Sequence, residues 1–308
     1  MIGHMTQATD IPPRAWSLLV ALALIWGASF LAIRTALDEI APLASVLYRT
    51  GPAALALWLW VAVRRLPVTR DPRLWVAFLG MGILNNAIPF SLMAWGQLHI
   101  PTGLTSILNA ATAIWGVLVA ALVFSDERLS PRKAAGTLIG FAGVATAIGW
   151  RALVALDVTS LAQLAVLGGT LSYAVAGAWG RRFLRGLTPE VAAAGMLTAA
   201  TLVMLPVTLA VEGMPPAHLG LRTLAAIGYY ALVATSCAYL LYYRILALTG
   251  SGTLLLVTLM IPPVAITLGA LVRGETLSSS AFGGFALLAL GLALIDGRLL
   301  RRRDARSV

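Results

Sequence analysis

The chain has 308 residues, of which 59% are hydrophobic and only 11% are charged, with a net charge of +10. Soluble globular domains carry roughly 25% charged residues. Together with a mean hydropathy of +0.89, this composition excludes an ordinary soluble protein and indicates a chain that lies largely within a membrane.

Apolar stretches follow one another from Trp16 to Leu299, and each is long enough, at about 20 residues, to cross a hydrocarbon core of roughly 30 Å. The first is too long, with flanks too polar, for a cleaved signal peptide. The sequence therefore predicts an all-α polytopic membrane protein with ten transmembrane helices. They cover residues 15–36, 42–63, 74–98, 102–124, 131–149, 160–181, 188–211, 220–247, 251–272 and 279–298.

Basic residues gather between the predicted spans on one side. Alternate connections and the carboxyl-terminal tail hold most of them: Arg14, Arg64, Arg65, Arg70, Arg73, Arg128, Arg132, Lys133, Arg181, Arg182, Arg185, Arg298, Arg301, Arg302, Arg303 and Arg306. The positive-inside rule then places both termini in the cytoplasm of a multi-pass protein of the cell inner membrane. Because the clusters recur with the membrane period, the net charge reflects topology, and we expect a lipid bilayer and no nucleic acid as partner.

Residues 127–143 and 275–291 share the pattern E-x-L-S-x5-G-x6-G, at a shift of 148 residues. Glu127 then matches Glu275, Gly136 matches Gly284 and Gly143 matches Gly291. The match divides the chain into residues 1–150 and 151–308, with five spans in each part and a short basic tail in the second. An odd number of spans inverts the second copy, so we expect two inverted five-helix repeats around a central cavity.

Several of these segments resemble a known family. Tyr239, Tyr243 and Ala247-Leu248 precede an apolar span with Pro262 and Ala265, then Gly274-Glu275 and a glycine-rich last span, while the first span carries Trp26-Gly27-x-Ser29. This arrangement is similar to the drug/metabolite transporter superfamily, EamA type, and most of all to the YddG-type exporters of aromatic amino acids. The resemblance implies a ten-helix basket whose cavity is framed by the first, third, fourth, sixth, eighth and ninth helices.

The chain departs from the family pattern in its first half. Ile114-Trp115 stands where the second half has Pro262-Pro263, and Ser125-Asp126-Glu127 replaces a Gly-Glu pair. A tandem proline would break a helix in a soluble core. In a membrane the freed backbone groups are tolerated beside protein or a water-lined cavity, so we expect Pro262 and Pro263 to face inward; the alternative is a kink that only curves the helix.

Polar and aromatic side chains inside the spans are the candidate solute contacts, because such groups are costly in lipid unless they serve a cavity or another helix. For each asparagine the alternative is an interhelical hydrogen bond, and for the tryptophans it is packing against leucine. We predict that the cavity is lined by Trp26, Asn85, Asn86, Asn109, Thr112, Trp115, Tyr173, Ser236, Tyr239, Tyr243 and Pro262.

All twelve carboxylates of the sequence fall in connections or at span ends. Proton-coupled pumps and exporters of lipophilic cations usually depend on a carboxylate within the membrane, so we expect passive or weakly coupled transport of neutral or zwitterionic solutes. Arg49 is the deepest charge, about 10 Å below the outer surface. We favour a structural arginine, bonded to backbone carbonyls or snorkelling to the interface, over one that attracts a carboxylate-bearing solute.

The sequence thus predicts a secondary transporter that exports small metabolites, amino acids including aromatic ones foremost, by alternating access. Nucleosides, sugar derivatives and other drug-like metabolites are alternative substrates, and a channel or sensory membrane protein is the alternative class. His4, His99 and His218 lie outside the spans and Cys237 is alone, so we expect no catalytic residue, metal or cofactor. Gly136 and Gly140 should pack the fifth helix within a monomer.

Overall fold

The computed structural model describes residues 13–68, 71–125, 129–149, 157–184, 186–216, 218–249 and 251–296, and within these ranges the regular structure is entirely helical. Glu127 of the first repeat motif, Arg128, Arg70, Arg185 and the basic tail after residue 296 lie outside the described residues.

The first part of the chain supplies five helical rods, two of which are composite. They are α1 (Pro13–Ala36), α2 (Pro42–Val63), the rod of α3 (Pro72–Gly82), the π-helix η1 (Ile83–Ala87) and α4 (Ile88–Gly96), the rod of α5 (Thr102–Asn109) and α6 (Thr112–Val123), and α7 (Pro131–Ile148).

The second part supplies five more rods, of which the third is composite. They are α9 (Val158–Phe183), α10 (Pro189–Val211), the rod of α11 (Leu221–Gly228), the π-helix η2 (Tyr229–Cys237) and α12 (Ala238–Thr249), then α13 (Ser251–Arg273) and α14 (Ser279–Asp296). Among the described residues, eight of the helical rods are long and apolar enough to cross a bilayer. Each of the ten predicted spans thus corresponds to one rod, and the predicted all-α polytopic fold is confirmed.

Several helices begin where the sequence supplies a proline or a capping side chain. Pro42, Pro72, Pro131 and Pro189 occupy the first helical turn, where the missing N–H costs no intrahelical hydrogen bond. The side chain of Asp157 accepts a hydrogen bond from the N–H of Ser160 at the start of α9, which satisfies one of the free N–H groups of the first turn. Proline and cap residues therefore fix these helix starts.

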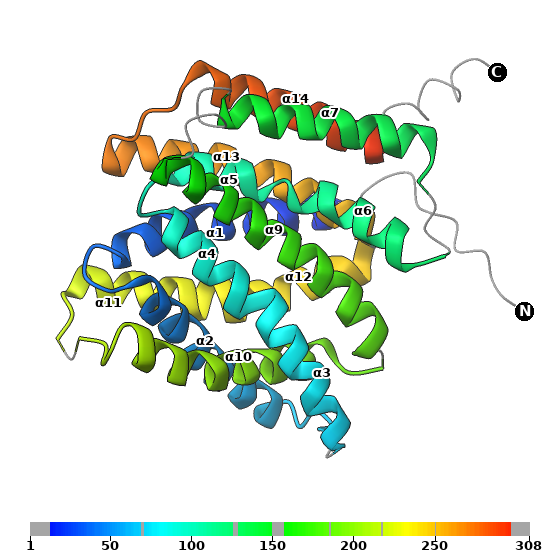
Figure 1. Cartoon of the computed structure of the whole chain (residues 1–308). Helices are drawn as coiled ribbons and strands as arrows, with labels where there is room; N and C mark the ends of the chain where they lie inside the picture. Colours follow the sequence, from blue (N-terminus) through cyan, green and yellow to red (C-terminus); the bar gives the residue numbers. More distant parts are fainter. Residues whose placement is uncertain are drawn as a thin grey trace, which may run out of the picture.

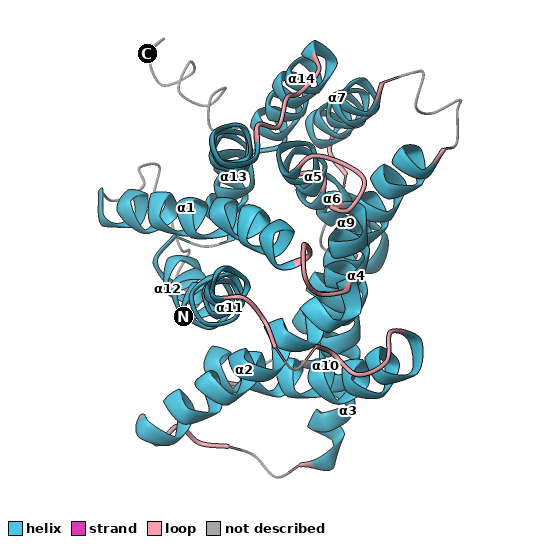
Figure 2. Cartoon of the chain, turned by 90° about the vertical axis from the view of Figure 1, so that its left-hand side faces the viewer, coloured by secondary structure: helices cyan, strands magenta, loops and turns pink. Residues whose placement is uncertain are grey.

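The two ends of the helical bundle differ. α1 begins and α14 ends at one end, and the connections α1–α2, α4–α5, α10–α11 and α13–α14 lie at the other (Figure 1). The main packing pairs join a helix of the first part to one of the second, as in α1 with α13, α2 with α10 and α4 with α9. Viewed from the end where these connections lie, α7 and α14 form a separate pair at the edge of the bundle (Figure 2).

Glycines bring α7 and α14 into backbone contact. A Cβ atom on Gly136 would lie 2.6 Å from the carbonyl oxygen of Gly291, and one on Gly143 would lie 2.7 Å from that of Gly284. The two helices are therefore antiparallel. Gly136 contacts Gly291, the repeat counterpart of Gly143, and Gly143 contacts Gly284, the repeat counterpart of Gly136. This exchange is what a two-fold axis between inverted repeats requires. As predicted, Gly136 and Gly140 pack within the chain, Gly140 against Ile114.

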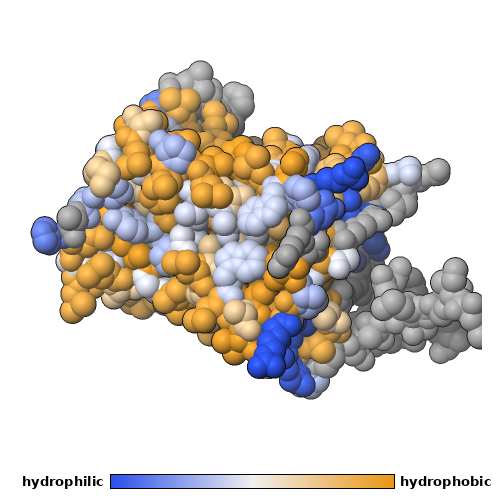
Figure 3. Space-filling model, turned by 90° about the horizontal axis from the view of Figure 1, so that it is seen from below, coloured by the Kyte–Doolittle hydropathy of each residue, from blue (hydrophilic) through white to orange (hydrophobic). Residues whose placement is uncertain are grey.

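The outer surface is suited to lipid. Large apolar side chains such as Leu55, Leu122 and Leu271 are exposed, and apolar residues cover most of the face seen in Figure 3. Strongly hydrophilic residues gather near the end where α1 begins and α14 ends (Figure 3). An apolar belt with a polar end is the surface of a protein immersed in a bilayer.

Candidate functional site

Two π-helices lie at matching places in the two parts of the chain. The shift of 148 residues carries η1, residues 83–87, onto residues 231–235, which fall within η2. A π-helix changes the hydrogen-bonding partner of each backbone carbonyl and is frequently found at functional sites. The widened turns present their side chains at the boundary between the two parts.

Side-chain hydroxyls bond to the carbonyls of both π-helices. The Thr235 hydroxyl donates to the carbonyl of Tyr230 at 2.7 Å, and the Ser236 hydroxyl bonds the carbonyl of Ala231 at 3.2 Å, in each case five residues back. In η1 the carbonyl of Leu84 accepts a 2.7 Å hydrogen bond from Ser172 of α9. These bonds stabilise backbone that would otherwise be poorly satisfied in an apolar medium.

Asn85 and Asn86 of η1 meet Tyr239 of α12. The side-chain N–H of Asn85 donates to the Tyr239 hydroxyl at 3.0 Å, and that hydroxyl donates to Oδ1 of Asn86 at 3.3 Å. Asn86 is fully buried, and its Nδ2 has no hydrogen-bond partner in the described part of the chain. The Tyr243 ring lies 6.4 Å from that of Tyr239, in a stacked orientation. Four of the predicted residues are thus brought together.

Arg49 of α2 lies beside this group. Its Nε donates to the hydroxyl of Thr235 at 2.9 Å, and its guanidinium carbon lies 3.8 Å from the centre of the Phe90 ring. Phe90 in turn contacts the ring of Tyr173 edge-on, with 6.4 Å between centroids. We call Arg49, Asn85, Asn86, Phe90, Tyr173, Thr235 and Tyr239 the polar cluster.

Trp26 of α1 and Ser236 of η2 each make a hydrogen bond that joins η2 to the first part of the chain. The indole N–H of Trp26 donates to the carbonyl of Ala234 at 3.1 Å, and its ring lies 5.9 Å from that of Tyr242. The Ser236 hydroxyl lies 3.3 Å from the carbonyl of Ala53 in α2. Both side chains therefore tie η2 to a helix of the first part of the chain.

The predicted residues of the fourth span form a separate group. The Thr112 hydroxyl donates to the carbonyl of Asn109 at 2.8 Å, across the turn at Ala110 and Ala111 that separates α5 from α6. Trp115 packs edge-on against Phe141, with 4.8 Å between centroids. In the described part of the chain these three side chains make no hydrogen bond to the polar cluster.

The paired prolines lie within α13, which continues as helix through both of them. Pro262 is buried and Pro263 is exposed, because consecutive side chains of a helix point about 100° apart. Pro262 is thus enclosed by protein, whereas Pro263 is not.

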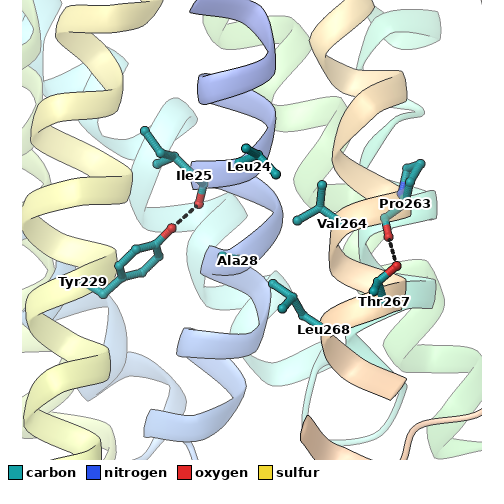
Figure 4. Close-up of a pocket in the computed structure, with 8 residues that line it drawn as sticks. All are labelled: Leu24, Ile25, Ala28, Tyr229, Pro263, Val264, Thr267 and Leu268. Carbon is teal, nitrogen blue, oxygen red and sulfur yellow. Dashed lines mark hydrogen bonds between the residues drawn. The ribbon is translucent and has the colours of Figure 1, made fainter. Parts of the chain in front are cut away.

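Pro263 instead borders an open recess between α1, η2 and α13, with a volume of about 610 Å³ (Figure 4). The Tyr229 hydroxyl donates to the carbonyl of Ile25 at 3.0 Å, and the Thr267 hydroxyl donates to that of Pro263 at 2.8 Å. The polar groups of the recess are thus bonded to backbone, and none of the eleven predicted residues lines it. Its lining is Leu24, Ile25, Ala28, Tyr229, Pro263, Val264, Thr267 and Leu268.

Four acidic side chains hydrogen-bond between the two parts of the chain. They belong to the connections α1–α2, α10–α11 and α13–α14, which lie at the same end of the bundle (Figure 1). Asp38 is paired with Arg273, and the Glu39 carboxylate accepts from the N–H of Gly220 at 2.8 Å. The hydrogen bonds from Arg273 hold the pKa of the Asp38 carboxyl below its ordinary value. We call Asp38, Glu39, Glu212 and Glu275 the carboxylate clamp.

The other two members of the clamp bind helix starts. Glu212 accepts from the N–H groups of Leu43 and Ala44 at 2.9 and 2.8 Å, at the start of α2. Glu275 accepts from the N–H and hydroxyl of Thr102 at 2.8 and 2.6 Å, at the start of α5. A negative charge at a helix N-terminus is favourable because the free N–H groups and the helix dipole point toward it.

The inverted five-helix repeats, the polar cluster at their boundary and the lipid-facing exterior define an integral membrane protein with the architecture of transporters. The profile of the EamA-like transporter family matches residues 14–149 and again residues 160–296. The chain therefore belongs to the EamA-like transporter family, as its motifs predicted.

Relatives cover almost the whole chain. It is 29% identical over 303 residues to a probable terminal-alkyne amino-acid exporter of Streptantibioticus cattleyicolor, covering 95% of this chain and 96% of that protein. It is 26% identical over 305 residues to a probable amino-acid metabolite efflux pump of Salmonella typhimurium, covering 94% and 97%. A solved structure titled "Crystal structure of protein" has the same fold, with a TM-score of 0.66 and 19% identity, covering 92% of this chain and 97% of that chain.

Proposed function

We propose that this protein exports small neutral or zwitterionic metabolites, amino acids including aromatic ones foremost, across the cell membrane by alternating access. The polar cluster carries the proposal, since it places Asn85, Asn86, Tyr173 and Tyr239 together where the two parts of the chain meet. The names of the two relatives, an amino-acid exporter and an amino-acid metabolite efflux pump, support this substrate class.

The chemistry of the polar cluster supports a solute without net positive charge. Its members are amides, phenols, a hydroxyl, an aromatic ring and one arginine, and in the described residues it contains no carboxylate. A lipophilic cation in such a site would meet a positive charge and no counter-charge. Transport then proceeds by binding and conformational change, with no covalent chemistry.

Alternating access requires the two parts, residues 1–150 and 151–308, to separate at one end of the molecule at a time. The carboxylate clamp holds them together at the end opposite the start of α1. With both termini cytoplasmic, the clamp is the outer gate, and its release is the step that opens the solute site to the outside. A single chain holds both parts and functions as a monomer.

Two other functions share some of these features. Nucleosides and sugar derivatives also bind through amide and hydroxyl groups, and a channel would likewise line its path with polar side chains. A channel passes solute in proportion to concentration, whereas a site that must close around its solute saturates.

Counterflow in proteoliposomes tests the proposal. Purified protein is reconstituted with unlabelled phenylalanine inside, and uptake of labelled phenylalanine is followed with and without competing amino acids, nucleosides and sugars. We expect saturable uptake that amino acids inhibit and nucleosides do not. Uptake that nucleosides alone inhibit, or that rises linearly without saturation, would overturn the proposal; protein-free liposomes are the control.

A further inference from the structure

Among the described residues, Arg49 is a cation without a counter-charge. In the described part of the chain no acidic oxygen lies within 4.0 Å of its guanidinium, and its one hydrogen bond runs from Nε to the Thr235 hydroxyl. Its position in the third turn of α2 places it inside the bilayer. A charge within the bilayer costs free energy unless an opposite charge or hydrogen bonds compensate it.

The structure does not support the structural interpretation of Arg49 favoured from the sequence. The guanidinium bonds to a side-chain hydroxyl and to no backbone carbonyl in the described residues. The side chain also reaches across to η2 and Phe90 at the boundary between the two parts of the chain, which is the opposite of snorkelling outward along α2.

The neighbours of Arg49 fix the plane of its guanidinium. Phe90 covers one face at 3.8 Å, and Thr235 holds Nε. Nη1 and Nη2 make no hydrogen bond in the described residues, and the arginine remains only partly buried. An arginine held in this way presents a fork of N–H donors, the geometry that binds a carboxylate through two parallel hydrogen bonds.

The polar groups around Arg49 are phenols and an amide, and among the described residues none of them carries a negative charge. The hydroxyls of Tyr173, Tyr230 and Tyr239 lie within electrostatic reach of the guanidinium. Asn86, which shares the Tyr239 hydroxyl, has a fully buried Nδ2 with no acceptor among the described residues. Buried donors in proteins are normally hydrogen-bonded, so this unpartnered amide, which Tyr239 links to the group around Arg49, indicates a missing acceptor.

We propose that Arg49 binds the carboxylate of the transported solute, and that this carboxylate supplies the counter-charge that Arg49 does not find among the described residues. The inference rests on the proposed function and narrows it: the solute must carry a carboxylate, so amino acids and other small carboxylates fit, whereas nucleosides, neutral sugars and amines do not. Arg49 is then the residue that selects substrate class.

Competition on the wild-type protein tests the solute side, with no risk of misfolding. Counterflow of labelled phenylalanine is measured against unlabelled phenylalanine, its primary amide and phenethylamine, which lack the carboxylate. Losing a hydrogen-bonded charge pair weakens binding by about tenfold to a hundredfold, so we expect both analogues to inhibit at least about tenfold less well. Equal inhibition by the amide would overturn the inference while leaving the proposed function in place.

Variants test the protein side. Arg49→Gln should raise the half-saturation concentration for phenylalanine about tenfold to a hundredfold, and Arg49→Lys should recover part of the loss because it keeps the charge without the fork. The matched control is Arg244→Gln, since Arg244 lies in α12 but is exposed; it should behave as wild type. Equal half-saturation for Arg49→Gln and Arg244→Gln would overturn the inference.

A binding measurement separates failure of the inference from failure of the proposed function. Thermal unfolding of the purified protein in detergent is followed with phenylalanine, phenylpropionate and phenylalanine amide. Stabilisation by both carboxylates and not by the amide, without any amino-acid counterflow, would support Arg49 as carboxylate site and reject amino-acid export. If neither carboxylate stabilises the wild type more than the amide does, the inference fails, whatever the fate of Arg49→Gln in folding.

Discussion

Arg273, the last residue of α13, binds the carboxylate of Asp38, which follows α1 in the chain. The guanidinium donates two hydrogen bonds, from Nη1 to Oδ2 at 2.8 Å and from Nη2 to Oδ1 at 3.1 Å. Arg34 of α1 reaches the same carboxylate, with 2.7 Å from its Nη1 to Oδ1. Two fixed arginines thus share one acidic side chain at the clamp end of the molecule. The pairing joins residues that are more than 200 positions apart in the sequence, 38 and 273.

The Asp38 pairing predicts a specific pH dependence. The arginine hydrogen bonds lower the pKa of Asp38 from its ordinary 3.8, so the folded protein binds its proton less tightly than the unfolded chain does. The stabilisation is therefore complete above about pH 4 and is lost as the pH falls through the lowered pKa. Because Asp38 is 41% exposed, the effect is at most about 1 kcal/mol.

Asp38→Asn tests this pairing by thermal unfolding in detergent from pH 3 to pH 8. We expect the variant to unfold slightly earlier than wild type at neutral pH and the difference to shrink toward the acid end. Added salt should also reduce the difference, because a partly exposed ion pair is screened. A difference that grew as the pH fell would contradict the assignment.

Glu212 predicts a graded series at the start of α2. Its carboxylate accepts from the N–H groups of Leu43 and Ala44, which have no intrahelical partners. Glu212→Gln keeps one acceptor oxygen and Glu212→Ala keeps none, so stability should fall in that order, with about 1–2 kcal/mol lost in the alanine variant. Unfolding temperatures in detergent give the order; an alanine variant as stable as wild type would exclude the capping role.

Substitution of glycine by alanine should have opposite effects at a glycine in the contact between α7 and α14 and at a glycine with free space beside it. In Gly136→Ala the new methyl would lie 2.6 Å from the carbonyl oxygen of Gly291, so the helices must move apart, at a cost of about 1–3 kcal/mol. Gly177 lies in α9, and no neighbouring atom lies within 4 Å of the position that a Cβ atom would take there, so Gly177→Ala should stabilise by about 0.5–1 kcal/mol. The unfolding temperatures of both variants test this prediction. Equal changes in unfolding temperature would show that the close approach of α7 and α14 does not determine the effect of Gly136→Ala.

The sequence predicted the helices well because their limits depend on local signals. The predicted span 42–63 coincides with α2, which begins at Pro42, and the predicted span 160–181 lies within α9, whose start Asp157 caps. The break between α5 and α6 was missed, because the residues at the break, Ala110 and Ala111, are neither glycine nor proline. A turn between two alanines reflects tertiary packing and leaves no local signal.

The polar cluster was predicted only in part, again because the sequence shows local signals but not tertiary contacts. Asn85, Asn86 and Tyr239 could be found as polar groups inside apolar spans. The partners of Arg49, Phe90 and Thr235, lie 41 and 186 residues further along the chain, and no local pattern joins them. The π-helices could not be predicted from such contacts either: Thr235 and Ser236 bond to carbonyls five residues back, but every residue has a carbonyl five positions before it, so the contact leaves no sequence pattern.

Thr235 connects the π-helix to the proposed carboxylate site and yields the last prediction. Its hydroxyl donates to the carbonyl of Tyr230 and accepts from Nε of Arg49. Thr235→Val keeps the shape but removes the hydroxyl, leaving two buried groups unpaired, at a cost of about 1–3 kcal/mol each. Thr235→Ser keeps both hydrogen bonds and loses only a methyl group.

We therefore expect Thr235→Val to unfold at lower temperature than Thr235→Ser and to show a higher half-saturation concentration in phenylalanine counterflow, because the guanidinium of Arg49 is no longer held in place. The serine variant should stay close to wild type in transport. If valine lowered stability but left half-saturation unchanged, Thr235 would serve η2 alone, and the orientation of Arg49 would have to come from its contact with Phe90.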